Sequence, residues 1–171
     1  MRKTFVSLIK TFLLIAALNA PASAEELPKP TGPVLLTVRG DISVTNNGET
    51  AEFDRDMLFA LGATELTTST IWTEGPQTFT GVTLKALAER LDIRGNQLQA
   101  VAVNDYAVDI PFSDAEDDAA LLAIDRNGQP MKVRDKGPIW LIFPFDQDRK
   151  YRSEVYHSRS VWQLVAINVL P

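Results

Sequence analysis

Few residues of this chain have the types and spacing that catalysis requires. The 171 residues include no cysteine and one histidine, His157. Thiol nucleophiles, disulfides, Cys-ligated zinc, iron–sulfur clusters and most histidine-based sites are therefore excluded. His157 is followed by Ser158 and Ser160, but no G-x-S-x-G motif presents a serine nucleophile. We expect His157 to be a surface residue in a loop.

Four acids lie close together at Asp114, Glu116, Asp117 and Asp118. Carboxylate oxygens are ligands that calcium prefers, but the run has neither the ligand spacing nor the central glycine of an EF-hand loop. We interpret these acids as the opening of a helix or as a solvated loop.

Basic residues gather between positions 132 and 159. Lys132, Arg134 and Lys136 alternate, so a strand would place all three on one face. Arg149, Lys150, Arg152 and Arg159 follow, and together they predict a local positive field that suits an anionic ligand. The alternative is a charged edge strand that prevents aggregation.

Aromatic residues are the third group that could build a site. A pocket could be lined by Trp72, Tyr106, Trp140, Tyr151, Tyr156 and Trp162. Because Trp140 and Trp162 stand in apolar segments, we expect those two in the core.

The N-terminus has the pattern of a secretory signal peptide. Basic residues precede a short apolar run at 12–18, and Ala22-Ser23-Ala24 is an A-x-A cleavage site. We predict a signal peptide at 1–24, cleaved after Ala24, and a periplasmic protein without stable membrane insertion. The signal carries three of the 17 basic residues and no acid, so the rest has 14 basic against 22 acidic residues. A net charge of −8 disfavours nucleic acid as a partner.

The elements that position these residues are typical of an α+β fold rich in antiparallel strands. An extended lead-in at 25–33 precedes one domain at 34–171. Asp54 and Thr83 predict the N-caps of two short helices, ending near Gly62 and Leu91. Strands are predicted at 34–38, directly after 46–48, and at 66–71, 98–103, 106–110, 121–124, 131–133, 139–143 and 161–170. We expect 139–143, apolar on both faces, to be a central strand.

From Leu66 onward a series of short motifs carries a family resemblance. These are Trp72, Phe79-Thr80-Gly81-Val82-Thr83-Leu84, 102–106 with Ile110-Pro111, Leu122-Ala123, 127–130, Gly137-Pro138, Phe143-Pro144, and 161–164 with Ile167 and Val169. In their order and spacing the chain resembles the sulfite-oxidase-type molybdopterin-binding oxidoreductase domain.

The resemblance implies a mixed α+β fold that holds a molybdenum–pterin cofactor. In that family a cysteine thiolate binds the metal from the segment before the tryptophan, which here is Thr67-Thr68-Ser69-Thr70. An alcohol is a poor substitute for a thiolate. The resemblance also implies a twin-arginine export signal for members loaded with cofactor, and this chain begins Met1-Arg2-Lys3 instead.

The sequence therefore leaves three hypotheses. The first is a non-catalytic periplasmic protein, a pseudoenzyme, which binds a small anionic ligand or a signalling partner such as a receptor sensor domain. Its predicted cofactor-type site comprises Trp72, Asn104, Tyr106, Arg134, Lys136 and Arg159. The second is a genuine molybdopterin-dependent oxidoreductase with a non-Cys metal ligand. The third is an unrelated enzyme or a domain that binds metal through carboxylates.

Overall fold

The structure is a computed structural model that describes residues 26–171. The predicted signal peptide lies outside the described residues and stays a prediction. Within residues 26–171, no helix is both long and apolar enough to span a membrane.

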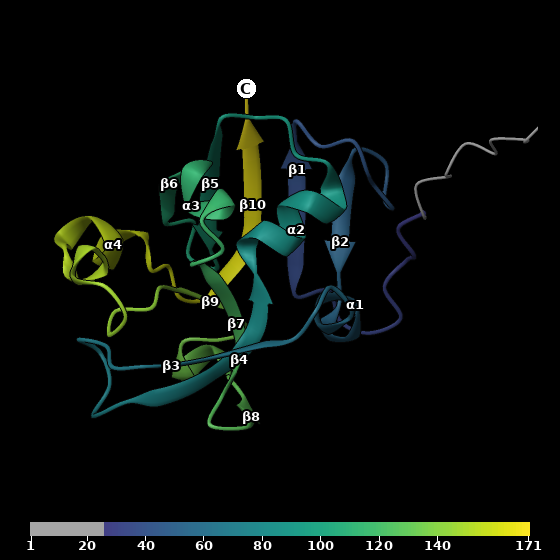
Figure 1. Ribbon diagram of the computed structural model, residues 1–171. Coiled ribbons are helices and arrows are strands. Elements are labelled where there is room, and N and C mark those ends of the chain that lie inside the picture. Colours follow the sequence, from purple (N-terminus) through teal and green to yellow (C-terminus); the bar gives the residue numbers. More distant parts are fainter. Residues whose placement is uncertain (1–25) are drawn as a thin grey trace, which may run out of the picture.

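Two five-stranded sheets make up the domain (Figure 1). The first, sheet A, has the order β2-β1-β10-β5-β6, and the second, sheet B, has the order β3-β4-β7-β8, with β9 paired to β7. The strands of sheet A are β1 (Leu36–Gly40), β2 (Thr50–Phe53), β5 (Gln97–Ala102), β6 (Ala107–Pro111) and β10 (Leu164–Leu170). The strands of sheet B are β3 (Thr64–Thr68), β4 (Gln77–Thr83), β7 (Leu121–Arg126), β8 (Gln129–Pro130) and β9 (Trp140–Ile142).

The pairing is mostly antiparallel, as predicted. Among the strand pairs described, β1 and β10 run parallel, and the others are antiparallel. Both sheets share one core, whose largest fully buried side chains are aromatic: Trp140, Phe53, Phe79 and Phe143. The predicted fold class, a mixed and mostly antiparallel α+β domain, is confirmed.

Six short helical segments complete the described chain. They are α1 (Arg55–Ala60), α2 (Leu84–Leu91), α3 (Ser113–Glu116), α4 (Glu154–Arg159) and the 3₁₀ helices η1 (Val133–Asp135) and η2 (Arg149–Arg152). The predicted helices are α1 and α2. In Figure 1, α2 lies across the face of sheet A, and α4 stands at the side of the molecule beside β6.

The predicted caps of both longer helices are present. The hydroxyl of Thr83 accepts a hydrogen bond from the amide of Ala86 at 3.2 Å, and α2 buries Leu84, Leu87 and Leu91. Just before this cap, β4 pairs with β7, and the register shifts between Thr80 and Gly81. A Cβ at Gly81 would lie 2.0 Å from the carbonyl oxygen of Leu122, so only glycine fits there.

Asp54 fixes both the start of α1 and the extended lead-in. Its carboxylate accepts hydrogen bonds from the amides of Met57 (2.9 Å), Thr31 (2.7 Å) and Gly32 (2.9 Å). The amide of Met57, followed by that of Gly32, lowers the pKa of Asp54 because these bonds favour the ionised carboxylate. One buried side chain thus ties residues before β1 to a helix after β2.

Substituting Asp54→Ala is expected to lower the free energy of unfolding by about 1–2 kcal/mol, the usual value of a lost N-cap. Because the pKa of Asp54 is lowered on folding, its contribution is complete above its ordinary pKa and is lost as the pH falls through the lowered value. Urea unfolding at neutral and acidic pH measures both effects. Asp54→Asn is the matched control, since asparagine also caps helices; equal stability of Asp54→Ala and the parent would contradict the assignment.

Two local predictions are wrong. Residues 131–133 do not form a strand: η1 begins at Val133, so Lys132, Arg134 and Lys136 do not share a strand face. His157 lies in α4, not in a loop.

The segment 139–143 forms the three-residue strand β9, which pairs with β7. On its other side, Ile139 bridges to Leu164 and the amide of Leu141 donates a hydrogen bond to the carbonyl of Val161. The segment therefore has backbone partners on both sides, as predicted for a central strand.

Candidate functional site

A pocket of about 450 Å³ lies where the loop after β3, the β5–β6 turn, α4 and the segment before β10 meet. This volume is in the range of small-molecule sites. Two of the three tryptophans and the single histidine are among its lining residues. The full lining is Ile71, Trp72, Ala102, Asn104, Tyr106, Glu154, His157, Ser158, Ser160, Val161 and Trp162. We refer to this site as the aromatic pocket.

Trp72 is the centre of the aromatic cluster that forms this pocket. Its ring meets four others edge-on, with centroid distances of 5.8 Å to Trp140, 6.2 Å to Phe145, 5.7 Å to His157 and 5.5 Å to Trp162. Edge-to-face contacts of this kind are favourable beyond the area they bury. The cluster therefore gives the pocket a preformed apolar wall.

Trp140 packs against this wall from the core side. It is fully buried, and its indole N–H donates a hydrogen bond to the carbonyl oxygen of Ser160 at 3.2 Å. Trp162, which we expected in the core, is instead 37 % exposed and lines the pocket. The expectation for Trp140 is confirmed.

The polar groups of the pocket do not form a nucleophile–base pair. The hydroxyl of Ser158 donates to the carbonyl of Val155 at 2.7 Å, and that of Ser160 donates to the carbonyl of Tyr156 at 2.8 Å. Both protons are thus committed to backbone carbonyls rather than to His157, whereas nucleophilic catalysis needs a base within hydrogen-bond reach. Glu154 is the one residue among the lining set with a formal charge at neutral pH.

Lys136 adjoins the pocket without lining it. Its ammonium nitrogen lies 4.0 Å from the ring centre of Trp162 and 5.3 Å from that of Trp140. Burial, and next the nearby charge of Arg126, lower the pKa of Lys136. Trp162 therefore lines the pocket and also contacts a partly dehydrated ammonium group.

The six residues predicted as a site do not form one cluster. Trp72, Asn104 and Tyr106 line the aromatic pocket. Lys136 lies beside it on Trp162. Arg134 is exposed with its Nε 3.5 Å from a carboxylate oxygen of Asp135. Arg159 is held in an ion pair away from the pocket lining.

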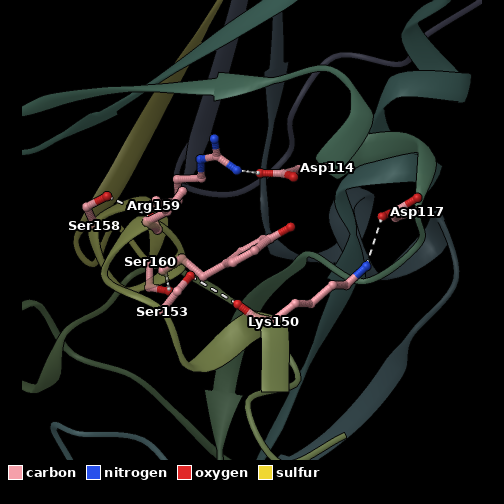
Figure 2. Close-up of polar contacts among 9 residues, drawn as sticks. Asp114, Asp117, Lys150, Ser153, Ser158, Arg159 and Ser160 are labelled. Carbon is pink, nitrogen blue, oxygen red and sulfur yellow. Dashed lines mark hydrogen bonds and ion pairs between the residues drawn. The ribbon is translucent and has the colours of Figure 1, made fainter. Parts of the chain in front are cut away.

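Figure 2 shows how the segment 148–160, which includes η2 and α4, is fastened to α3. Nη1 of Arg159 lies 3.0 Å from Oδ2 of Asp114, and Nζ of Lys150 lies 3.4 Å from Oδ2 of Asp117. We call the segment 148–160 the α4 arm. Because α4 contributes Glu154 and further lining residues, the buried pair of Arg159 and Asp114 helps to hold one wall of the pocket in place.

Asp114 and Glu116 lie in the first turn of α3, which confirms the interpretation of these acids as a helix opening, but Asp114 is not solvated. It is only 5 % exposed, and burial raises its pKa, while the charge and hydrogen bond of Arg159 oppose that rise. No group of three or more His, Asp or Glu residues within 26–171 is placed to hold a metal ion. Asp114 and Asp117 fasten the α4 arm to α3.

The segment 67–70 corresponds, by the resemblance, to the family's metal-binding loop. Its threonine hydroxyls are hydrogen-bonded to other groups of this chain. The side chain of the buried Thr68 accepts a hydrogen bond from the amide of Asp146 at 3.1 Å. Its neighbours are also engaged: Thr67 with the hydroxyl of Thr78 at 3.0 Å, and Thr70 with the hydroxyl of Thr73 at 2.9 Å.

Comparisons with known proteins agree with this fold. A family model described as the oxidoreductase molybdopterin binding domain matches residues 44–147. The sulfane dehydrogenase SoxCD from Paracoccus pantotrophus is similar in structure, with a TM-score of 0.57, 15 % sequence identity and 80 % of this chain covered. The match spans 38 % of that SoxCD chain. A search of curated proteins gives no match.

Fold and family model together define an α+β domain of the molybdopterin-binding oxidoreductase type. This chain belongs to the oxidoreductase molybdopterin-binding domain family. The predicted family is thereby confirmed.

The residues present do not fit the metal that the family name implies. The chain has no cysteine, and the threonine hydroxyls of segment 67–70 are already hydrogen-bonded to other groups of the protein. Neutral alcohols are weak substitutes for the soft thiolates that favour such metals. We therefore derive no chemical step through a molybdenum centre.

Sequence reasoning missed part of the pocket. Ile71 and Glu154 had no recognisable signal, because no motif marks them and α4 is too short for a periodic pattern. Trp162 was recognised as a candidate aromatic residue, but its apolar surroundings in the sequence predicted burial rather than the partial exposure observed.

Proposed function

We propose that this chain is an exported, non-catalytic binding protein whose aromatic pocket holds a small anion with a flat apolar body. The observation that carries this proposal is the position of Lys136, whose ammonium lies 4.0 Å from the ring of Trp162 on the margin of the pocket. The aromatic wall offers the surface for the apolar body, and Lys136 offers the charge for the anionic group.

The electrostatics around Lys136 favour an anion. The ammonium is partly dehydrated, and Arg126 adds a second positive charge close enough to lower the pKa of Lys136. A bound anion would offset both the burial of the ammonium and its repulsion by Arg126, because an opposite charge stabilises the ionised lysine. Glu154, at the α4 side of the lining, repels an anion. The negative group of the ligand therefore points toward η1, and its apolar body points toward Trp72.

The absence of a reactive constellation in the pocket supports a binding role. The serine hydroxyls donate to backbone carbonyls, and no cysteine is available for metal or nucleophilic chemistry. Aromatic rings with a few polar groups are the common composition of binding pockets. The fold by itself does not decide between binding and catalysis.

Lys136→Met is expected to weaken binding of 2-naphthoate about tenfold, because it removes the charge and keeps most of the side-chain volume. The probes are 2-naphthoate and the uncharged 2-naphthamide, compared by isothermal titration calorimetry. The amide should bind the parent and the variant alike. Lys132→Met is the control, because Lys132 is exposed and precedes η1. Equal binding of the acid and the amide to the parent would overturn the assignment of an anion.

The family match also supports a second candidate, a molybdopterin-dependent oxidoreductase with a non-Cys ligand. Elemental analysis and oxidised-pterin fluorescence of protein purified from its native host separate the two. Stoichiometric molybdenum with pterin would favour the enzyme, and the absence of both would favour the binding protein.

A further inference from the structure

Exposed apolar side chains collect around the mouth of the aromatic pocket. Among residues 26–171, seven large apolar residues are prominently exposed. Ile71, Tyr106 and Trp162 line the pocket itself. Val103 and Val155 are chain neighbours of lining residues, and Val133 is hydrogen-bonded through its carbonyl to Gln163, the residue after Trp162. Val34 lies apart, in the lead-in to β1. The six around the pocket are Ile71, Val103, Tyr106, Val133, Val155 and Trp162.

Gln163 joins two members of this group from different elements. Its carbonyl accepts a hydrogen bond from the amide of Val103 at 2.9 Å. Its side-chain Nε2 donates to the carbonyl of Val133 at 2.7 Å. Val103 and Val133 are 50 % and 51 % exposed, and Trp162 is the residue next to Gln163. Gln163 therefore holds the backbones of Val103 and Val133 close to Trp162, and we call these three exposed apolar residues the pocket rim.

The charge beside the pocket rim is positive on the η1 side. Arg126, Lys132, Arg134 and Lys136 lie along the β7–β8 hairpin and η1, with Asp135 paired to Arg134. The chain as a whole has an excess of acids. A local positive surface next to exposed apolar residues is complementary to an acidic partner that carries an apolar anchor. Contiguous exposed apolar surface commonly marks an interaction site.

We propose that the pocket rim docks an acidic segment of another protein, with an apolar or aromatic side chain of that segment packed between Val103, Val133 and Trp162. The acidic residues of the segment lie over η1, near Arg134. This inference shares the face used in the proposed function but relies on Val103 and Val133, which do not line the pocket. A small ligand and a docked segment thus share Trp162 and Lys136, but only the docked segment depends on Val103 and Val133.

The test uses a short synthetic peptide with tryptophan and isoleucine flanked by aspartates, labelled for fluorescence polarisation. A charge-reversed peptide with lysines in place of the aspartates is the comparison. The acidic peptide should bind about tenfold more tightly than the charge-reversed peptide, and added salt should reduce the difference. The doubly substituted variant Val103→Ser with Val133→Ser should lose about tenfold in affinity for the acidic peptide.

Val34→Ser is the matched control, because it also removes an exposed valine, of 46 % exposure, but outside the pocket rim. Equal binding of both peptides, or an effect of Val34→Ser as large as that of the double variant, would overturn the proposal. If sedimentation shows that the parent is a dimer and the double variant a monomer, the pocket rim binds a second copy of this chain instead, and the proposal is overturned. Binding of 2-naphthoate should be unchanged in the double variant, so failure of the docking test leaves the small-ligand proposal separately testable.

Discussion

Trp140→Ala is expected to lower the free energy of unfolding by about 3–5 kcal/mol, the usual range for truncating a large aromatic side chain in a core. Trp140 is fully buried and has edge-on contacts with Phe79, Trp72 and Trp162, at centroid distances of 5.5, 5.8 and 6.4 Å. Its removal leaves a cavity below the aromatic wall, so the pocket should lose both shape and affinity. Thermal or urea unfolding, together with 2-naphthoate titration, measures the two effects.

Trp140→Phe separates packing from hydrogen bonding. Phenylalanine retains part of the volume but cannot donate to the carbonyl of Ser160, as the indole N–H does at 3.2 Å. We expect an intermediate loss of stability, with the unpaired carbonyl contributing about 1–3 kcal/mol. A Trp140→Ala variant as stable as the parent would show that the side chain is not part of the core described above.

Arg159→Met is expected to lower the free energy of unfolding at neutral pH by about 3 kcal/mol, because it leaves the buried carboxylate of Asp114 without its partner. Asp114 is 5 % exposed and lies 3.0 Å from Nη1 of Arg159. Loss of this ion pair should also loosen the α4 arm. Binding of 2-naphthoate should therefore weaken, although Arg159 does not line the pocket.

The effect should depend on pH in a defined direction. Burial raises the pKa of Asp114 even with Arg159 present, and loss of the arginine removes the two influences that oppose that rise. A carboxyl group whose pKa is raised on folding stabilises the protein below its unfolded pKa, and this stabilisation is lost as the pH rises through the folded value. The deficit of Arg159→Met should thus be largest at neutral pH and shrink toward about pH 4.

Two further variants test this account. Lys150→Met removes the second ion pair, whose side chains are both largely exposed, and should change stability little. Asp114→Asn combined with Arg159→Met removes both charges of the buried pair and should recover most of the lost stability at neutral pH. A pH-independent deficit in Arg159→Met would contradict the role assigned to Asp114.

Sequence reasoning identified elements wherever a local signal was strong. Asp54 and Thr83 predicted two helix starts because their side chains cap the following amides directly. The final strand was predicted because Val161–Leu170 is long and apolar. The strand β4 was missed because its sequence, Gln77–Thr83, alternates poorly and contains Gly81, where the backbone of β7 approaches closely at a register shift. Such an approach is a property of tertiary structure.

The site was predictable only in part for the same reason. Aromatic and amide side chains of Trp72, Asn104 and Tyr106 followed from motifs, and the fold places them in one pocket. The basic residues were grouped on the premise of a strand at 131–133, and η1 replaces that strand. Arg159 was assigned to a ligand because no sequence pattern shows that a distant acid, Asp114, becomes buried beside it.

The position of β10 has a consequence for the order in which the chain can fold. β10, the last strand in sequence, lies between β1 and β5, and its partner in β1 is distant in sequence, as in the pair of Thr37 with Ala166. Until residues 164–170 are available, β1–β2 and β5–β6 are separate hairpins with open edges. Non-local pairings of this kind slow folding, since a long loop must close before they form. Sheet A is therefore completed late, and the segment that completes it begins just after Trp162, a wall of the pocket.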